Sequence, residues 1–176
     1  METQQLTIVG AGGMGSGIAQ KFAMQGIAVD LVDLSADILA RSLDQIRRNL
    51  ETLIEGQYLS REKADQVLPR IRPIPDLHAA GNSRFVLEAV NENLELKKKV
   101  FRQLDEICPA ETVLASNTSS LSISSIASAT RRRERVIGCH WINPPYLIPL
   151  VDVVVKQIDR EHRRIVIEPL PGLLDS

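Results

Sequence analysis

The chain has 176 residues, of which 44% are hydrophobic and 24% charged, and its formal net charge at pH 7 is −1. This is the composition of an ordinary globular chain, and it excludes the intrinsically disordered, collagenous and disulfide-scaffold classes. The near-zero charge and the 3% content of aromatic residues argue against a nucleic-acid partner.

The N-terminus and the cysteines indicate a cytoplasmic chain. Residues 1–5 lack the basic and apolar segments of a signal peptide, and no apolar run approaches the ~20 residues that span a bilayer. Cys108 and Cys139 are too few for a disulfide framework, which favours a reducing compartment. No Cys/His spacing suggests a metal site. We therefore expect no membrane partner and no bound metal.

The first half of the chain alternates patterns of strand and helix. A β-rich run at residues 6–9 ends in glycines, and Met14, Ile18 and Phe22 then recur at helical spacing. The elements expected after them are a strand over residues 28–33, a helix capped by Ser35, a short helix opened by Ser60 and a strand over residues 71–74. Pro73 indicates that this last segment is either an edge strand or an irregular piece, because proline has no N–H to donate.

The second half continues the alternation. The expected elements are strands over residues 85–90, 113–116, 135–139 and 150–155, a helix from about Asn93 and another over residues 122–129. Strands that alternate with helices form parallel βαβ units, so we predict an α/β fold with a doubly wound, mostly parallel sheet of Rossmann type. We assign residues 1–155 to this domain and residues 156–176 to a divergent tail, with a candidate strand at residues 165–167.

A glycine-rich turn follows the first strand and opens the first helix. Residues 10–15 match G-x-G-x-x-G in the strand–turn–helix context that this motif requires. Gly10 permits the tight turn, Gly12 lets the backbone approach a pyrophosphate, and Gly15 lets the helix pack on the strand. With Gly13 and Met14, these residues are expected to bind a dinucleotide at the free N–H groups of the helix start.

Asp33 ends the second strand, close to the ~20-residue spacing expected after the last glycine. Its carboxylate would accept hydrogen bonds from the ribose hydroxyls of adenosine and would repel a 2′-phosphate. We therefore expect the cofactor to be NAD, in preference to NADP.

With this fingerprint in place, the chain resembles the 3-hydroxyacyl-CoA dehydrogenase family over residues 6–155. The resemblance rests on four blocks in the right order: residues 10–19, residues 87–93 with Lys97 and Phe101, residues 115–121, and residues 138–144 followed by 150–154. It implies oxidation of the 3-hydroxyl of an acyl-CoA to a ketone, with hydride passing to NAD. It also implies a helical C-terminal domain with homodimer contacts, which is not recognisable in residues 156–176.

The resemblance assigns individual residues as well. The matched positions are Glu92, Lys97 and Asn117 on the cofactor side, and His140, Asp152, Ser119 and Asn143 on the catalytic side. In the family's terms, His140 is the base, Ser119 bonds the reacting oxygen, and Asp152 replaces a glutamate that orients the histidine. The chemistry suits these types, because histidine titrates near neutral pH and a carboxylate on its other ring nitrogen stabilises the imidazolium.

The substrate remains open between two classes. Residues 116–120 look like the acyl-CoA branch, whereas residues 143–150 look like the branch that acts on small 3-hydroxy acids, such as carnitine and gulonate dehydrogenases. Asp152 is one methylene shorter than the family's glutamate, and a misplacement of about 1 Å can cost ~100-fold in rate. The chain is thus expected to be a truncated cofactor domain that is weakly active or inactive alone.

Two other kinds of function are also open. The apolar tail, with no second domain to cover it, suggests a non-enzymatic NAD-binding module that works with a partner chain. A hydrolase triad of Ser119, His140 and Asp152 is disfavoured, because its order differs from that of α/β-hydrolases and the G-x-S-x-G elbow is missing.

Overall fold

The computed structural model describes residues 6–148 and the backbone of residues 151–154. Its strands form one sheet in the order β3-β2-β1-β4-β5-β6-β7. They are β1 (Leu6–Val9), β2 (Val29–Val32), β3 (Ile71–Ile74), β4 (Phe85–Glu88), β5 (Val113–Ser116), β6 (Val136–Trp141) and β7 (Val151–Val154). All neighbouring strands are parallel except β6 and β7. The parallel order 3-2-1-4-5-6 is that of the Rossmann fold, so the predicted fold class is confirmed.

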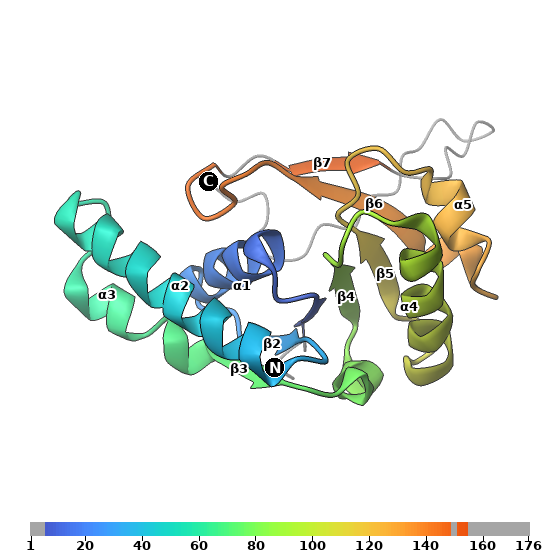
Figure 1. Cartoon of the computed structure of the whole chain (residues 1–176), viewed down its shortest axis with the longest axis horizontal. Helices are drawn as coiled ribbons and strands as arrows, with labels where there is room; N and C mark the ends of the chain where they lie inside the picture. Colours follow the sequence, from blue (N-terminus) through green and yellow to red (C-terminus); the bar gives the residue numbers. More distant parts are fainter. Residues whose placement is uncertain (1–5, 149–150, 155–176) are drawn as a thin grey trace.

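Helices cover both faces of this sheet, with α1 and α2 on one side and α4 and α5 on the other (Figure 1). The helices are α1 (Gly13–Met24), α2 (Ala36–Glu55), α3 (Arg61–Asp65), α4 (Leu94–Ile107) and α5 (Ile123–Ala127), with short 3-10 turns η1 (Leu68–Arg70), η2 (Leu77–Asn82) and η3 (Arg133–Arg135). Ser35 and Ser60 cap α2 and α3 as predicted, each accepting a backbone N–H with its hydroxyl oxygen.

The sheet divides the apolar interior into two layers, because successive strand residues point to opposite faces. Ile8 and Leu87 belong to the layer under α1 and α2. Val9 and Val86 belong to the layer under α4 and α5. All four side chains are at most 5% exposed. The central strands β1 and β4 are therefore buried on both faces. Because these strands are central, their carboxyl ends lie at the middle of one sheet edge.

The end of β6 and the 3-10 turns differ from the sequence prediction. β6 runs to Trp141 instead of ending at residue 139, so His140 lies within the strand and not after it. β7 pairs antiparallel with β6 over residues 138–141, and this second partner carries the hydrogen-bonded ladder two residues further. η2 was not predicted, because six residues are too few for a periodic pattern. The candidate strand at residues 165–167 and the tail at 156–176 lie outside the described residues.

Candidate active site

The glycine turn joins β1 to α1 with close backbone contacts. Gly10 has a φ of +101°, and a Cβ there would lie 2.7 Å from the carbonyl oxygen of Ala89. A Cβ on Gly15 would lie 1.8 Å from the Gly10 carbonyl oxygen. A side chain at Gly12 or Gly13 would instead meet nothing within 4 Å, so the outer side of the turn is open. This is the arrangement that lets a pyrophosphate approach the backbone.

The start of α1 differs from the starts of the other helices. α2, α3, α4 and α5 are each capped by a side chain, whereas no side chain among the described residues accepts a hydrogen bond from the first turn of α1. The first N–H groups of a helix have no partner inside the helix, and they attract anions when nothing caps them. The turn therefore fits the phosphates of a dinucleotide.

Asp33 and Ser42 brace the turn from neighbouring elements. Asp33 follows β2 directly, and its two carboxylate oxygens accept the N–H groups of Ala11 and Ser35, each at 3.0 Å. The hydroxyl of Ser42, in α2, donates to the Ala11 carbonyl at 2.7 Å. A carboxylate can accept about four hydrogen bonds, so Asp33 keeps acceptor capacity for ribose hydroxyls. Sequence reasoning found Asp33 but missed Ser42, whose spacing from the turn carries no local pattern.

Ser119 and His140 meet at the same edge of the sheet. A hydrogen bond of 2.9 Å joins Ser119 Oγ to His140 Nε2. Ser119 is exposed in the loop after β5, and His140 is half-buried near the end of β6. Asn117 ties the two strands together there, since its Oδ1 accepts the Trp141 N–H at 2.8 Å. The structure thus brings together a hydroxyl and an imidazole that the sequence places 21 residues apart.

Glu92 holds the loop that carries Ser119. Its Oε1 accepts the Thr118 hydroxyl at 2.6 Å and the backbone N–H groups of Ser119 and Ser120 at 3.0 and 3.2 Å. Partial burial acts to raise the pKa of the Glu92 carboxyl, but these donors and the charge of Lys97 lower it more, so the net pKa is below its ordinary value. Glu92 is therefore an anion that organises this loop.

Lys97 lies beneath Glu92 and is almost completely buried. Its side chain is 1% exposed, and Nζ donates to Glu88 Oε1 at 2.7 Å and to the Val90 carbonyl at 3.2 Å. It also lies 3.4 Å from Glu92 Oε2. Sequence reasoning missed Glu88, which is 0% exposed at the end of β4. The available signal was an acidic residue inside an apolar strand, since buried carboxylates need partners.

Asn143 and Asp152 complete the predicted set. Asn143 is exposed in the turn after β6, where a cis peptide bond joins it to Pro144. Asp152 is the register partner of His140 across the β6–β7 pair, so the two residues are directly opposite each other. The position of the Asp152 side chain lies outside the described part of the structure.

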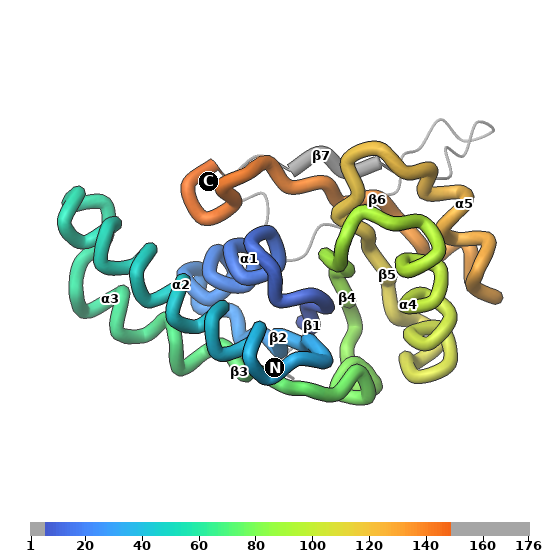
Figure 2. The backbone as a smooth tube through the Cα atoms, in the orientation of Figure 1, coloured from blue at the N-terminus to red at the C-terminus, as the bar shows by residue number. Residues whose placement is uncertain are grey.

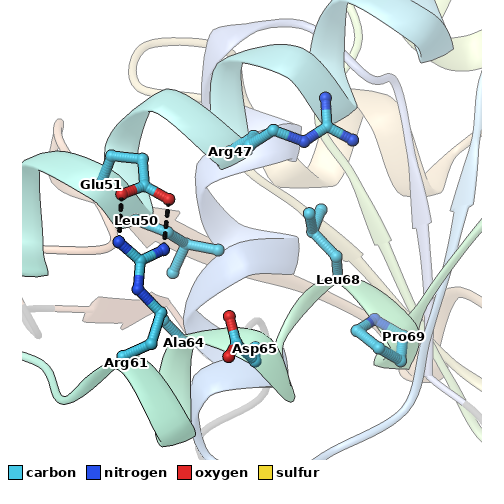
Figure 3. A pocket seen from close by; sticks show the side chains of 8 residues that line it. All are labelled: Arg47, Leu50, Glu51, Arg61, Ala64, Asp65, Leu68 and Pro69. Carbon is cyan, nitrogen blue, oxygen red and sulfur yellow. Dashed lines mark hydrogen bonds and ion pairs between the residues drawn. The ribbon is translucent and has the colours of Figure 1, made fainter.

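A pocket of about 350 Å³ lies elsewhere, between α2, α3 and η1. α3 lies beside α2 (Figure 2), and at the rim of the pocket the guanidinium of Arg61 binds the carboxylate of Glu51 through two hydrogen bonds of 2.6 and 2.7 Å (Figure 3). None of its lining residues belongs to the predicted site. Among the described residues, no cluster of His, Cys, Asp and Glu side chains could hold a metal ion, and no helix is long and apolar enough to cross a membrane.

The fold and the glycine turn define a dinucleotide-binding Rossmann domain, and the Ser119–His140 pair is the kind of site that moves a proton beside such a cofactor. The family model described as "3-hydroxyacyl-CoA dehydrogenase, NAD binding domain" matches residues 5–162. The chain therefore belongs to the 3-hydroxyacyl-CoA dehydrogenase family, as its NAD-binding domain.

Individual relatives agree with this assignment. The chain is 41% identical to the 3-hydroxyadipyl-CoA dehydrogenase of Escherichia coli over 88% of its own length and 32% of that protein. It is 40% identical to a probable 3-hydroxybutyryl-CoA dehydrogenase of Bacillus subtilis, over 88% of this chain and 54% of the relative. The crystal structure of (S)-3-hydroxybutyryl-CoA dehydrogenase from Ralstonia eutropha superimposes with a TM-score of 0.85 at 34% identity, covering 92% of this chain and 58% of that one. The chain thus spans between about one third and somewhat over half of these relatives.

Proposed function

We propose that this chain is the cofactor half of a dehydrogenase that oxidises the 3-hydroxyl of an acyl-CoA thioester. The observation that carries the proposal is the 2.9 Å contact between Ser119 Oγ and His140 Nε2 at the carboxyl edge where the glycine turn lies. Ligands of doubly wound sheets bind at this edge. The relatives named above act on 3-hydroxyadipyl-CoA and 3-hydroxybutyryl-CoA by their names, which supports this substrate class.

In this proposal, His140 accepts the proton of the substrate hydroxyl. A hydroxyl that loses hydride from its carbon must also lose its proton, and an imidazole nitrogen is a base of suitable strength. We assign His140 Nε2 as the acceptor, with Ser119 Oγ donating to the substrate oxygen in place of its present hydrogen bond to the ring. NAD, when bound, supplies the hydride acceptor.

The other residues support this centre in the proposal. Asp152 stands opposite His140 on β7, where a carboxylate could orient the imidazole and stabilise its charged form. Glu92 and Lys97 keep the Ser119 loop in place from below. Asn117 and Asn143 flank the strand that carries His140 and offer amide groups to cofactor and substrate.

The cofactor half of the proposal is tested by titration calorimetry of the chain with NAD. Binding is expected because the uncapped start of α1 and the acceptor oxygens of Asp33 fit the pyrophosphate and the ribose. Lys98→Ala is a control that should bind NAD like the parent, since Lys98 pairs only with the exposed Glu95 in the part of the chain that the structure describes. The absence of heat at millimolar NAD would contradict the proposal.

The substrate half is tested by following NADH formation with 3-hydroxybutyryl-CoA and, separately, with free 3-hydroxybutyrate. The proposal expects oxidation of the thioester to exceed that of the free acid and to be lost in His140→Gln. Faster oxidation of the free acid would favour the small 3-hydroxy acid class instead. NAD binding without any turnover would agree equally with a cofactor domain that is inactive alone and with a non-enzymatic module. We also place the chain in the cytoplasm, where the free, buried Cys108 and Cys139 would stay reduced.

A further inference from the structure

A fully buried carboxylate lies directly under the Ser119 loop. Glu88 is the last residue of β4 and is 0% exposed. Its Oε1 accepts the Lys97 ammonium and the Val90 N–H, both at 2.7 Å. Its Oε2 accepts the Ser116 hydroxyl at 2.6 Å, from the adjacent position of β5. Burying a carboxylate costs desolvation free energy, so a buried carboxylate with this many partners is expected to have a role in the protein.

The carboxylate connects to the Ser119 loop through one cation. Lys97 Nζ donates to Glu88 and to the Val90 carbonyl, and it forms an ion pair with Glu92 at 3.4 Å. Glu92 in turn accepts the Ser119 N–H at 3.0 Å, and Ser119 Oγ contacts His140 Nε2. Every contact from Glu88 to His140 is therefore polar and shorter than 3.5 Å.

The charges along this path alternate. Glu88 and Lys97 form a buried ion pair at 2.7 Å, and on its other side Lys97 faces the anionic Glu92. Burial raises the pKa of the Glu88 carboxyl, and the neighbouring Lys97 ammonium counteracts that rise. Without the Glu88 charge, Lys97 would have Glu92 as its one carboxylate partner among the contacts described above. Its Nζ would then move toward Glu92, which also holds the Ser119 loop.

We propose that Glu88 is a positioning residue of the reaction centre, which sets the place of Glu92 and the Ser119 loop through Lys97 and so aligns Ser119 Oγ with His140 Nε2. Glu88 touches neither of the two reacting side chains, and it acts through the buried Lys97. The proposal rests on the function proposed above for Ser119 and His140.

Glu88→Gln removes the charge and little else. The amide oxygen can still accept from Lys97 and Val90, and the amide nitrogen can donate to the Ser116 oxygen, because a hydroxyl both donates and accepts. Asp105→Asn is the matched control. Asp105 is also a buried carboxylate, lies on the same helix as Lys97, and binds Arg131 and Arg132 away from the Ser119 loop.

The readout is the ring nitrogen spectrum of the histidines, recorded on the full chain without NAD or substrate. Ser119→Ala defines the shift that follows loss of the Ser119–His140 hydrogen bond, and His140→Gln assigns the resonances. We expect Glu88→Gln to move the His140 resonances in the direction of Ser119→Ala. We expect Asp105→Asn to lower the melting temperature and to leave the His140 resonances unchanged. His78, which pairs with Asp76 on the surface, should not move in either variant.

Unchanged His140 resonances in Glu88→Gln would overturn the proposal, and so would an equal shift in Asp105→Asn. If Glu88→Gln does not fold, Ser116→Ala provides the second arm, because it removes one hydrogen bond to Glu88 and leaves every charge. A smaller shift in the same direction is then expected, and no shift would overturn the proposal. These spectra need neither cofactor nor turnover, so a chain that binds no NAD refutes the proposed function separately.

Discussion

At the scale of single residues, we predict that Asp33 combines its structural role with recognition of the ribose. It accepts the N–H of Ala11, so the same carboxylate braces the glycine turn and faces the expected ribose site. Hydrogen bonds to a charged group are worth about 1.5–3 kcal/mol, which corresponds to ~10- to 100-fold in binding. The two roles can be separated by comparing a neutral and a reversed charge.

We predict that Asp33→Arg weakens NAD binding by about 10- to 100-fold and improves NADP binding, because the guanidinium replaces a repelling anion with a partner for the 2′-phosphate. Asp33→Asn keeps one acceptor oxygen for the turn and should weaken NAD without improving NADP as much. Calorimetric titration of the three proteins with both dinucleotides measures this. An unchanged preference in Asp33→Arg would show that Asp33 does not hold the ribose.

The residues that sequence reasoning found and missed differ in how local their pattern is. Gly10, Gly15 and Asp33 were predicted because strand, turn and helix impose a short, regular spacing on them. Ser42 and Glu88 were missed because their partners come from distant elements, so their roles depend on how the helices pack. The contact between Ser119 and His140 likewise required the pairing of β5 with β6.

At the scale of elements, α1 packs tightly against the turn after β6. A Cβ on Gly17 would lie 2.7 Å from Pro145 Cγ and 3.1 Å from its Cδ. The proline ring is stiff, so the turn that carries Asn143 would have to shift away from the helix. Alanine is intrinsically better than glycine in a helix by about 1 kcal/mol. The stability change caused by an alanine at Gly17 therefore shows whether the cost of overpacking exceeds the gain in helix propensity.

We predict that Gly17→Ala destabilises the fold by up to about 2 kcal/mol, because overpacking costs ~1–3 kcal/mol and the gain in helix propensity offsets about 1 kcal/mol of it. Pro145→Ala removes both contacting ring atoms, so the double variant should recover most of the loss. Urea unfolding of the four proteins gives the coupling energy. A Gly17→Ala protein as stable as the parent, or an additive double variant, would mean that the two elements do not press on each other.

Most element boundaries were predictable, and the exceptions share a cause. Caps such as Ser35 and Ser60 are local signals, and the structure places both where expected. The length of β6 was not predictable from its own residues, because His140 and Trp141 are held in the ladder by the antiparallel pairing with β7, the next strand of the chain. A strand's end thus depends on its partner as well as on its own residues.

At the scale of the whole molecule, the sheet separates two cores, and each contains one cysteine. Cys139 belongs to the layer under α1 and α2, and Cys108 to the layer under α4 and α5. Burial raises the pKa of both thiols to about 11. At pH 8 about one thiol in 1,000 would then be the reactive thiolate, so both cysteines are protected by charge state as well as by access.

We predict that both thiols react with a disulfide reagent at pH 8 only as fast as the domain opens, and at a common rate. NAD binds the folded state, so at 100 times its Kd it should stabilise that state by about 2.7 kcal/mol and slow both reactions ~100-fold. A domain that opens one layer at a time would instead label Cys108 and Cys139 at different rates. Slower labelling of Cys139 alone would mean that NAD stabilises only the layer beneath α1. Equal slowing of both reactions would show that the two cores open as one cooperative unit, because they share the sheet.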